Sequence, residues 1–162
     1  MLGLTTLGVY HTAISVVALI AGIILLVRDH SISGRTSLGK VYVVATILTC
    51  ITSLAIFQHG GFGKPHVLAI LTLIVLAIAA LAGYTRVFGR LSRYVEGVSY
   101  SATFLFHMIP GITETSTRLP RSAPLVASAD APELQVATAL LLVIFLIGAT
   151  LQIFSLRSRP AV

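Results

Sequence analysis

The stretch that decides the fold is residues 4–27, which read LTTLGVYHTAISVVALIAGIILLV. It contains no charged residue, and it is long enough to cross a bilayer, because a spanning helix needs about 20 mostly apolar residues. No basic residue precedes it, and no cleavage site of small residues follows it. We therefore expect a retained membrane span rather than a cleaved signal peptide.

Four further stretches of the chain are long enough to span. Residues 40–58, 65–84 and 134–156 are strongly apolar, whereas residues 94–112 carry several polar side chains. We expect this more polar segment to cross inside the bundle, although its crossing is left open by the sequence. The prediction is an all-α integral membrane bundle of four to five transmembrane helices, forming one domain over residues 1–162.

The composition agrees with a membrane location. Of the 162 residues, 56% are hydrophobic and 10% are charged, and the mean hydropathy is +0.99. An ordinary soluble domain is about 45–50% apolar and about 25% charged. This composition excludes a soluble globular enzyme, a disordered tail and a nucleic-acid-binding module, and the lone Cys50 allows no disulfide within the chain.

The basic residues indicate how the spans are oriented. With five spans and the N-terminus outside, the cytoplasmic side holds eight Lys and Arg residues and the outer side holds three. The count is the same if residues 94–112 do not cross, because the long loop and the tail then exchange sides. By the positive-inside rule, we expect a multi-pass protein of the bacterial inner (plasma) membrane with its N-terminus outside. The net charge of +6 is then a topology signal.

Four of the five histidines fall in one layer near the outer face. At 1.5 Å per residue, His11 and His107 lie roughly 6–10 Å below that face, and His59 and His66 flank the short outer turn. Two facing histidines are what a b-type haem needs, and three or four at one depth suit copper or zinc. The alternative is that His59 and His66 are turn residues and that His11 and His107 form hydrogen bonds between helices.

A polar stripe strengthens the case for a site in the fourth segment. Glu96, Tyr100, Thr103 and His107 are spaced by four, three and four residues, so they share one helical face. The stripe could orient a histidine, relay protons or line a small cavity, or it could supply hydrogen bonds that fix the packing. Pro110-Gly111 should end or kink this helix, and Glu114 should pair with Arg118 if residues 113–120 are helical.

Several stretches resemble a family of small bacterial multi-pass membrane proteins catalogued as a domain of unknown function. The resemblance is carried by residues 34–42 (GRTSLGKVY), 59–66 (HGGFGKPH) and 106–120 (FHMIPGITETSTRLP). That family often has a basic dipeptide with histidine before its Leu-Gly-Arg-x-Tyr stretch, where this chain has Arg35-Thr36. A weaker analogy, to the histidine-bearing b-type membrane cytochromes, is one of fold alone.

We therefore predict a multi-pass membrane protein with a redox or electron-transfer role, and we leave open whether it is an enzyme. Haem b or a transition metal is the expected cofactor. The expected cofactor-binding residues are His11, His107, His66, Tyr100 and Glu96, and the candidate metal ligands are His11, His59, His66 and His107. Two alternatives remain, a non-enzymatic accessory subunit of a larger membrane complex and a small proton-coupled transporter. The expected partners are the lipid bilayer and a second copy or larger complex, but no nucleic acid.

Overall fold

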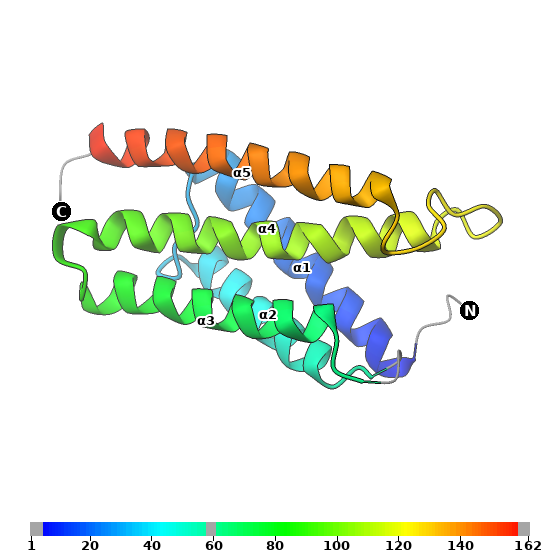
Figure 1. Ribbon diagram of the computed structural model, residues 1–162. Helices are drawn as coiled ribbons and strands as arrows, with labels where there is room; N and C mark the ends of the chain where they lie inside the picture. Colours follow the sequence, from blue (N-terminus) through cyan, green and yellow to red (C-terminus); the bar gives the residue numbers. More distant parts are fainter. Residues whose placement is uncertain (1–4, 58–60, 159–162) are drawn as a thin grey trace.

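The computed structural model describes residues 5–57 and 61–158, and these form five long α-helices and one short 3-10 helix. The elements are α1 (Thr6–Asp29), α2 (Ser37–Leu54), α3 (Lys64–Thr85), η1 (Gly89–Leu91), α4 (Ser92–Arg118) and α5 (Pro132–Ser158). Figure 1 shows α3, α4 and α5 running side by side, with α1 and α2 behind them. The predicted all-α helical bundle is confirmed.

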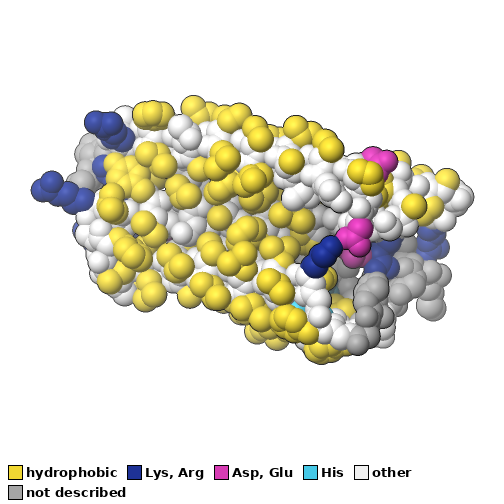
Figure 2. Space-filling model, in the orientation of Figure 1, with side chains coloured by type: hydrophobic (Ala, Val, Ile, Leu, Met, Phe, Trp, Pro, Cys, Tyr) yellow, Lys and Arg dark blue, Asp and Glu magenta, His cyan; other side chains and the backbone are white. Residues whose placement is uncertain are grey.

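Four helices, α1, α2, α3 and α5, are long and apolar enough to cross a membrane. In the space-filling view, hydrophobic side chains cover the middle of the molecule and charged side chains gather at its two ends (Figure 2). A surface of this kind is stable in lipid and not in water. The chain is a multi-pass membrane protein.

The fifth helix, α4, is the polar one, and it runs the length of the bundle between α3 and α5 (Figure 1). Its buried side chains include Glu96, Tyr100, Thr103 and His107. The polar segment therefore lies inside the bundle, as its composition predicts, because polar side chains facing lipid would lose their hydrogen-bond partners.

The bundle has two chemically different ends. The basic end is formed by residues 30–36, residues 86–91 and the C-terminal part of α5. The histidine end is formed by the start of α1, the turn after α2 and residues 119–131, which join α4 to α5. At the histidine end, Lys64 pairs with Asp130 at 2.6 Å. The Lys64 ammonium holds the pKa of the Asp130 carboxyl below its usual value.

The sequence left open whether Pro110-Gly111 ends or kinks the helix. The helix does not end there, because α4 continues through Pro110 to Arg118. Proline removes one backbone hydrogen bond from a helix. Within a membrane bundle this loss is tolerated, because neighbouring helices can satisfy the backbone group that is left without a partner. The expected Glu114–Arg118 ion pair forms at 2.5 Å across the added turn, so the long loop shrinks to residues 119–131.

Small residues let the helices approach closely. Ala18 and Gly22 on α1, Thr46 and Thr49 on α2, and Ala79 and Gly83 on α3 are all buried. These small residues are packing positions, as expected where lipid provides no hydrophobic driving force between helices.

Gly39 marks the tightest of these approaches. A Cβ atom built on Gly39 would lie only 1.8 Å from the backbone carbonyl oxygen of Ser33. The loop from α1 turns back over the first turn of α2 here, where the Thr36 side chain accepts a hydrogen bond from the Gly39 amide at 3.0 Å. A backbone atom cannot rotate away as a side chain can, so the loop requires glycine.

We predict that Gly39→Ala destabilises the protein by about 1–3 kcal/mol, the usual range for overpacking. The matched control is Gly111→Ala, because a Cβ there meets its nearest neighbour, Leu19, at an ordinary 3.6 Å. Alanine within a helix is about 0.5–1 kcal/mol more favourable than glycine. Thermal melts in detergent, followed by circular dichroism, should show a lowered midpoint for Gly39→Ala alone. Equal midpoints would contradict the account of this turn.

Candidate functional site

The stripe on α4 divides into two polar groups, one toward each end of the bundle. Glu96 and Tyr100 lie toward the basic end, and Thr103 and His107 lie in the next two turns. Because Tyr100 contributes mostly an aromatic ring to this face, the two groups are separated by apolar atoms. The four residues are on one face as predicted, but they have different partners.

Glu96 fastens the loop after α1 onto α3 and α4. Its carboxylate accepts hydrogen bonds from Ser33 Oγ at 2.9 Å and from Arg35 Nη2 at 2.5 Å. Arg35 also donates to the backbone carbonyl of Gly83 at 3.2 Å. A Cβ on Gly83 would lie 2.6 Å from Oε1 of Glu96, so glycine makes room for the carboxylate. We call Ser33, Arg35, Gly83 and Glu96 the loop clamp.

Two tyrosines pack beside the loop clamp at Gly34. The Tyr84 hydroxyl donates to the Gly34 carbonyl oxygen at 2.9 Å, and a Cβ on Gly34 would meet the Tyr100 hydroxyl at 2.7 Å. Tyr100 is therefore a packing partner of the loop. Among the described residues, neither Tyr100 nor Glu96 is hydrogen-bonded to a histidine.

Further along α4, a chain of hydrogen bonds links α4 to α2. Thr103 donates its hydroxyl hydrogen to the backbone carbonyl of Tyr100 at 2.7 Å. A hydroxyl has only one hydrogen, so Thr103 must accept the bond from the Tyr42 hydroxyl, 2.8 Å away. The Tyr42 hydroxyl is thereby a donor to Thr103 and an acceptor for any other partner.

His107 is oriented by a threonine of α2. Its Nε2 atom lies 3.1 Å from Thr46 Oγ1, and which of the two atoms donates depends on the tautomer of the histidine. The Nδ1 atom makes no hydrogen bond among the described residues. His107 is buried, at 6% exposed.

His11 is oriented by a second threonine of α2. Its Nδ1 atom lies 2.9 Å from Thr52 Oγ1. The Thr52 hydroxyl donates to backbone carbonyls of its own helix, Leu48 at 2.8 Å and Thr49 at 3.0 Å. Thr52 must therefore accept from His11, which places the hydrogen on Nδ1 and leaves the lone pair on Nε2.

His66 has the opposite arrangement and does not suit a metal. Its Nδ1 accepts the backbone N–H of Gly63 at 3.2 Å, so the hydrogen is on Nε2. The ring lies between Phe57 and Phe62, with centroids 4.8 and 5.2 Å away, and its Nε2 has no partner among the described residues. The turn interpretation fits His66 better than the ligand interpretation. His59 lies outside the described residues.

Of the three predicted ligands that lie among the described residues, the structure holds His11 and His107 against one helix, α2. Their partners, Thr52 and Thr46, are six residues apart, or about 9 Å along the axis. Over residues 5–57 and 61–158, no group of three or more His, Cys, Asp and Glu side chains could hold a metal ion.

The hydrogen-bond chain favours packing over proton relay for the stripe. From Tyr42 it runs through Thr103 and ends at the carbonyl of Tyr100, and Thr46 holds His107 in a separate bond. A backbone carbonyl cannot pass a proton on, and the loop clamp with Glu96 lies beyond it. The arrangement therefore pairs helices and orients His107.

Several important residues were missed by the sequence reasoning. Arg35 and Ser33 were seen only as loop residues, although a buried Glu96 needs a cation or donors nearby. Gln152, a single amide in the apolar α5, accepts from Ser101 Oγ at 3.2 Å and donates to the His30 carbonyl at 3.1 Å. A lone amide in a membrane span signals such a partner on another element.

Comparison with protein-family models, curated proteins and solved structures gave no match. The family resemblance described above, the accessory-subunit alternative and the predicted partners therefore stay predictions from the sequence.

We predict that removing the two charges of the loop clamp destabilises the protein unequally, because the Arg35 side chain is 53% exposed and that of Glu96 only 8%. Arg35→Met leaves a buried carboxylate without its cation and should cost about 1–3 kcal/mol. Glu96→Gln leaves an exposed guanidinium that water can solvate and an amide that Ser33 can still reach, so it should cost less. Thermal melts in detergent measure both.

The control for the clamp is Lys64→Gln, which removes a pair whose side chains are 90% and 78% exposed. Such pairs contribute little, and the midpoint should stay unchanged. If Glu96→Gln proved as damaging as Arg35→Met, burial of the carboxylate would not be the cause of the asymmetry.

Proposed function

We propose that this membrane protein holds a metal centre through His11 and His107, with a redox or metal-handling role. The observation that supports the proposal is that a threonine of α2 holds each imidazole through one ring nitrogen, at 2.9 Å for His11 Nδ1 and 3.1 Å for His107 Nε2. We infer that each imidazole donates to its threonine, which leaves a lone pair on Nε2 of His11 and on Nδ1 of His107. A histidine that ligates a metal almost always has its second nitrogen oriented in this way.

The chemistry shared by the candidate centres is ligation by neutral imidazole. Two histidines are the number of axial ligands in a bis-histidine haem b, and imidazole also suits copper and zinc. With only two protein ligands, a bare ion would complete its coordination with water or a substrate, as open catalytic sites do. Imidazoles at this depth would also be costly to keep for packing alone.

The two centres require different rearrangements. A bare ion bound by both histidines requires the two rings to approach each other, since their threonine partners are about 9 Å apart along α2. Haem needs a slot between α1 and α4, and the cavity described in the next subsection is lined by neither His11 nor His107. Because α1 packs mainly on α2, and α4 mainly on α3 and α5, separation of α1 from α4 would leave the larger helix contacts in place.

The first test is an absorption spectrum with metal analysis of protein expressed with haem, and separately with copper or zinc, supplied. We expect either a Soret band that moves on dithionite reduction or a bound ion near stoichiometry with the chain. His11→Gln and His107→Gln should abolish binding, and Thr52→Val should weaken it about 10–100-fold. His30→Gln, at the opposite end of the bundle, is the control and should bind normally.

Colourless, metal-free protein under all these conditions would overturn the proposal. So would binding that survives both His11→Gln and His107→Gln. Because His11 and His107 also make packing bonds, circular dichroism of each variant must show that it is folded.

We further propose that the basic end faces the cytoplasm of a bacterium, which puts the histidine pair near the outer face. The test uses single cysteines in a Cys50→Ala background, at the exposed positions Arg121 and Arg90. A membrane-impermeant maleimide should label Arg121→Cys in whole cells and Arg90→Cys only after lysis. The reverse pattern would place the histidine end inside.

A further inference from the structure

A cavity of about 440 Å³ lies between α1, α4 and α5, away from the histidine pair. Its position follows from the way α5 is held: of the other described helices, α5 packs on α4 and not on α1. Gln152 bridges the remaining gap to the end of α1 through the His30 carbonyl. The cavity is open to the outside of the bundle, because Ile144 and Leu151 in its α5 wall are 64% and 63% exposed.

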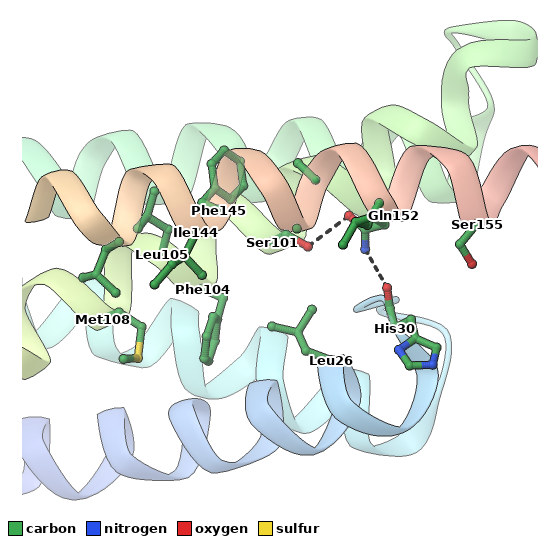
Figure 3. Close-up of a pocket in the computed structure, with 14 residues that line it drawn as sticks. Leu26, His30, Ser101, Phe104, Leu105, Met108, Ile144, Phe145, Gln152 and Ser155 are labelled. Atoms are coloured by element: carbon green, nitrogen blue, oxygen red, sulfur yellow. Dashed lines mark hydrogen bonds between the residues drawn. The ribbon is translucent and has the colours of Figure 1, made fainter.

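Most of the cavity wall is apolar. Figure 3 shows Phe104, Leu105 and Met108 of α4 facing Ile144 and Phe145 of α5. The lining on α5 extends from Leu141 to Ser155, which is about 21 Å along the helix. A hollow of this length and character matches an extended apolar chain better than a compact polar metabolite.

Polar groups gather at the basic end of the same cavity. Ser101, Gln152, Ser155 and His30 lie together there in Figure 3. Gln152 uses one amide hydrogen on the His30 carbonyl, which leaves its second hydrogen, together with the Ser155 hydroxyl and the His30 ring, able to donate. His30 follows the last residue of α1, next to Arg28, so these donors lie at the depth of the membrane interface.

The charge of the lining identifies the class of occupant. No Lys, Arg, Asp or Glu lines the cavity, so nothing there neutralises a phosphate head group. The donors at the polar end match carbonyl oxygens, and the narrow apolar section admits a tail. We propose that the cavity binds a neutral membrane amphiphile, with a compact head that bears carbonyl groups and one long apolar tail.

Gly148 provides a variant that fills the cavity without disturbing the fold. It lines the cavity, and a Cβ built on it meets no atom within 4 Å. Gly148→Phe should therefore occupy the hollow. Its matched control is Ile147→Phe, because the neighbouring Ile147 is 57% exposed and does not line the cavity.

The experiment titrates a decyl-substituted benzoquinone, as the probe, into the purified full chain in detergent. Thermal midpoint and native mass spectrometry report binding. We expect the probe to stabilise the wild type and Ile147→Phe, and to bind Gly148→Phe at least about tenfold more weakly. Decane, which has the tail without the carbonyl head, should bind the wild type about tenfold more weakly than the probe.

Three outcomes would overturn the proposal. They are equal binding of the probe to wild type and Gly148→Phe, equal binding of decane and probe, and displacement of the probe by phosphatidylglycerol. The last would identify a phospholipid chain as the occupant. The His11→Gln and His107→Gln variants should bind the probe normally, so this test succeeds or fails independently of the metal centre.

Discussion

Inside a lipid bilayer, a buried polar side chain has no water to form hydrogen bonds with, so its hydrogen-bond partner must lie within the protein. This constraint governs how α4 sits in the bundle. Its polar face meets the hydroxyls of Tyr42 and Thr46 on α2 and that of Ser33 in the loop after α1, and those bonds hold these elements to α4. The apolar faces of the outer helices then follow, because they have only lipid to contact.

The threonines of α2 have a second consequence. A threonine hydroxyl in a helix can donate its hydrogen to a carbonyl of its own helix, and it is then only an acceptor toward side chains of other helices. Thr52 does this toward Leu48 and Thr49, so His11 opposite becomes a donor through Nδ1. Thr46 holds His107 through Nε2, and we propose that the histidine donates there too. The same threonine–histidine hydrogen bonds thus hold the helices together and orient each imidazole for ligation.

The two ends of the bundle have different kinds of contacts between their elements. At the basic end, the loop clamp and Gln152 tie the connection after α1 to α3, α4 and α5. At the other end, the contacts between helices are made through histidines whose second nitrogens remain open. The cavity between α1, α4 and α5 has its polar groups at the basic end, where Gln152 lines it, so the proposed ligands would approach the protein from different depths of the membrane.

The sequence was sufficient for the helices and for the face of α4, because apolar length and residue spacing are local properties. It could not predict that the helix passes through Pro110, since the tolerance of that break depends on neighbouring helices. Nor could it predict that Glu96 pairs with Arg35, sixty-one residues away. The depth of His66 was anticipated, but its tautomer was not, because the Gly63 amide that fixes it becomes a partner only in the folded turn.

The central claim is that His11 and His107 are neutral imidazoles with opposite protonated nitrogens. Nitrogen-15 NMR of histidine-labelled protein in detergent, with the signals assigned through single His→Gln variants, measures this directly. The account predicts the hydrogen on Nδ1 of His11 and on Nε2 of His107 in the metal-free protein. A hydrogen on the other nitrogen of either ring, or a charged ring at neutral pH, would contradict it.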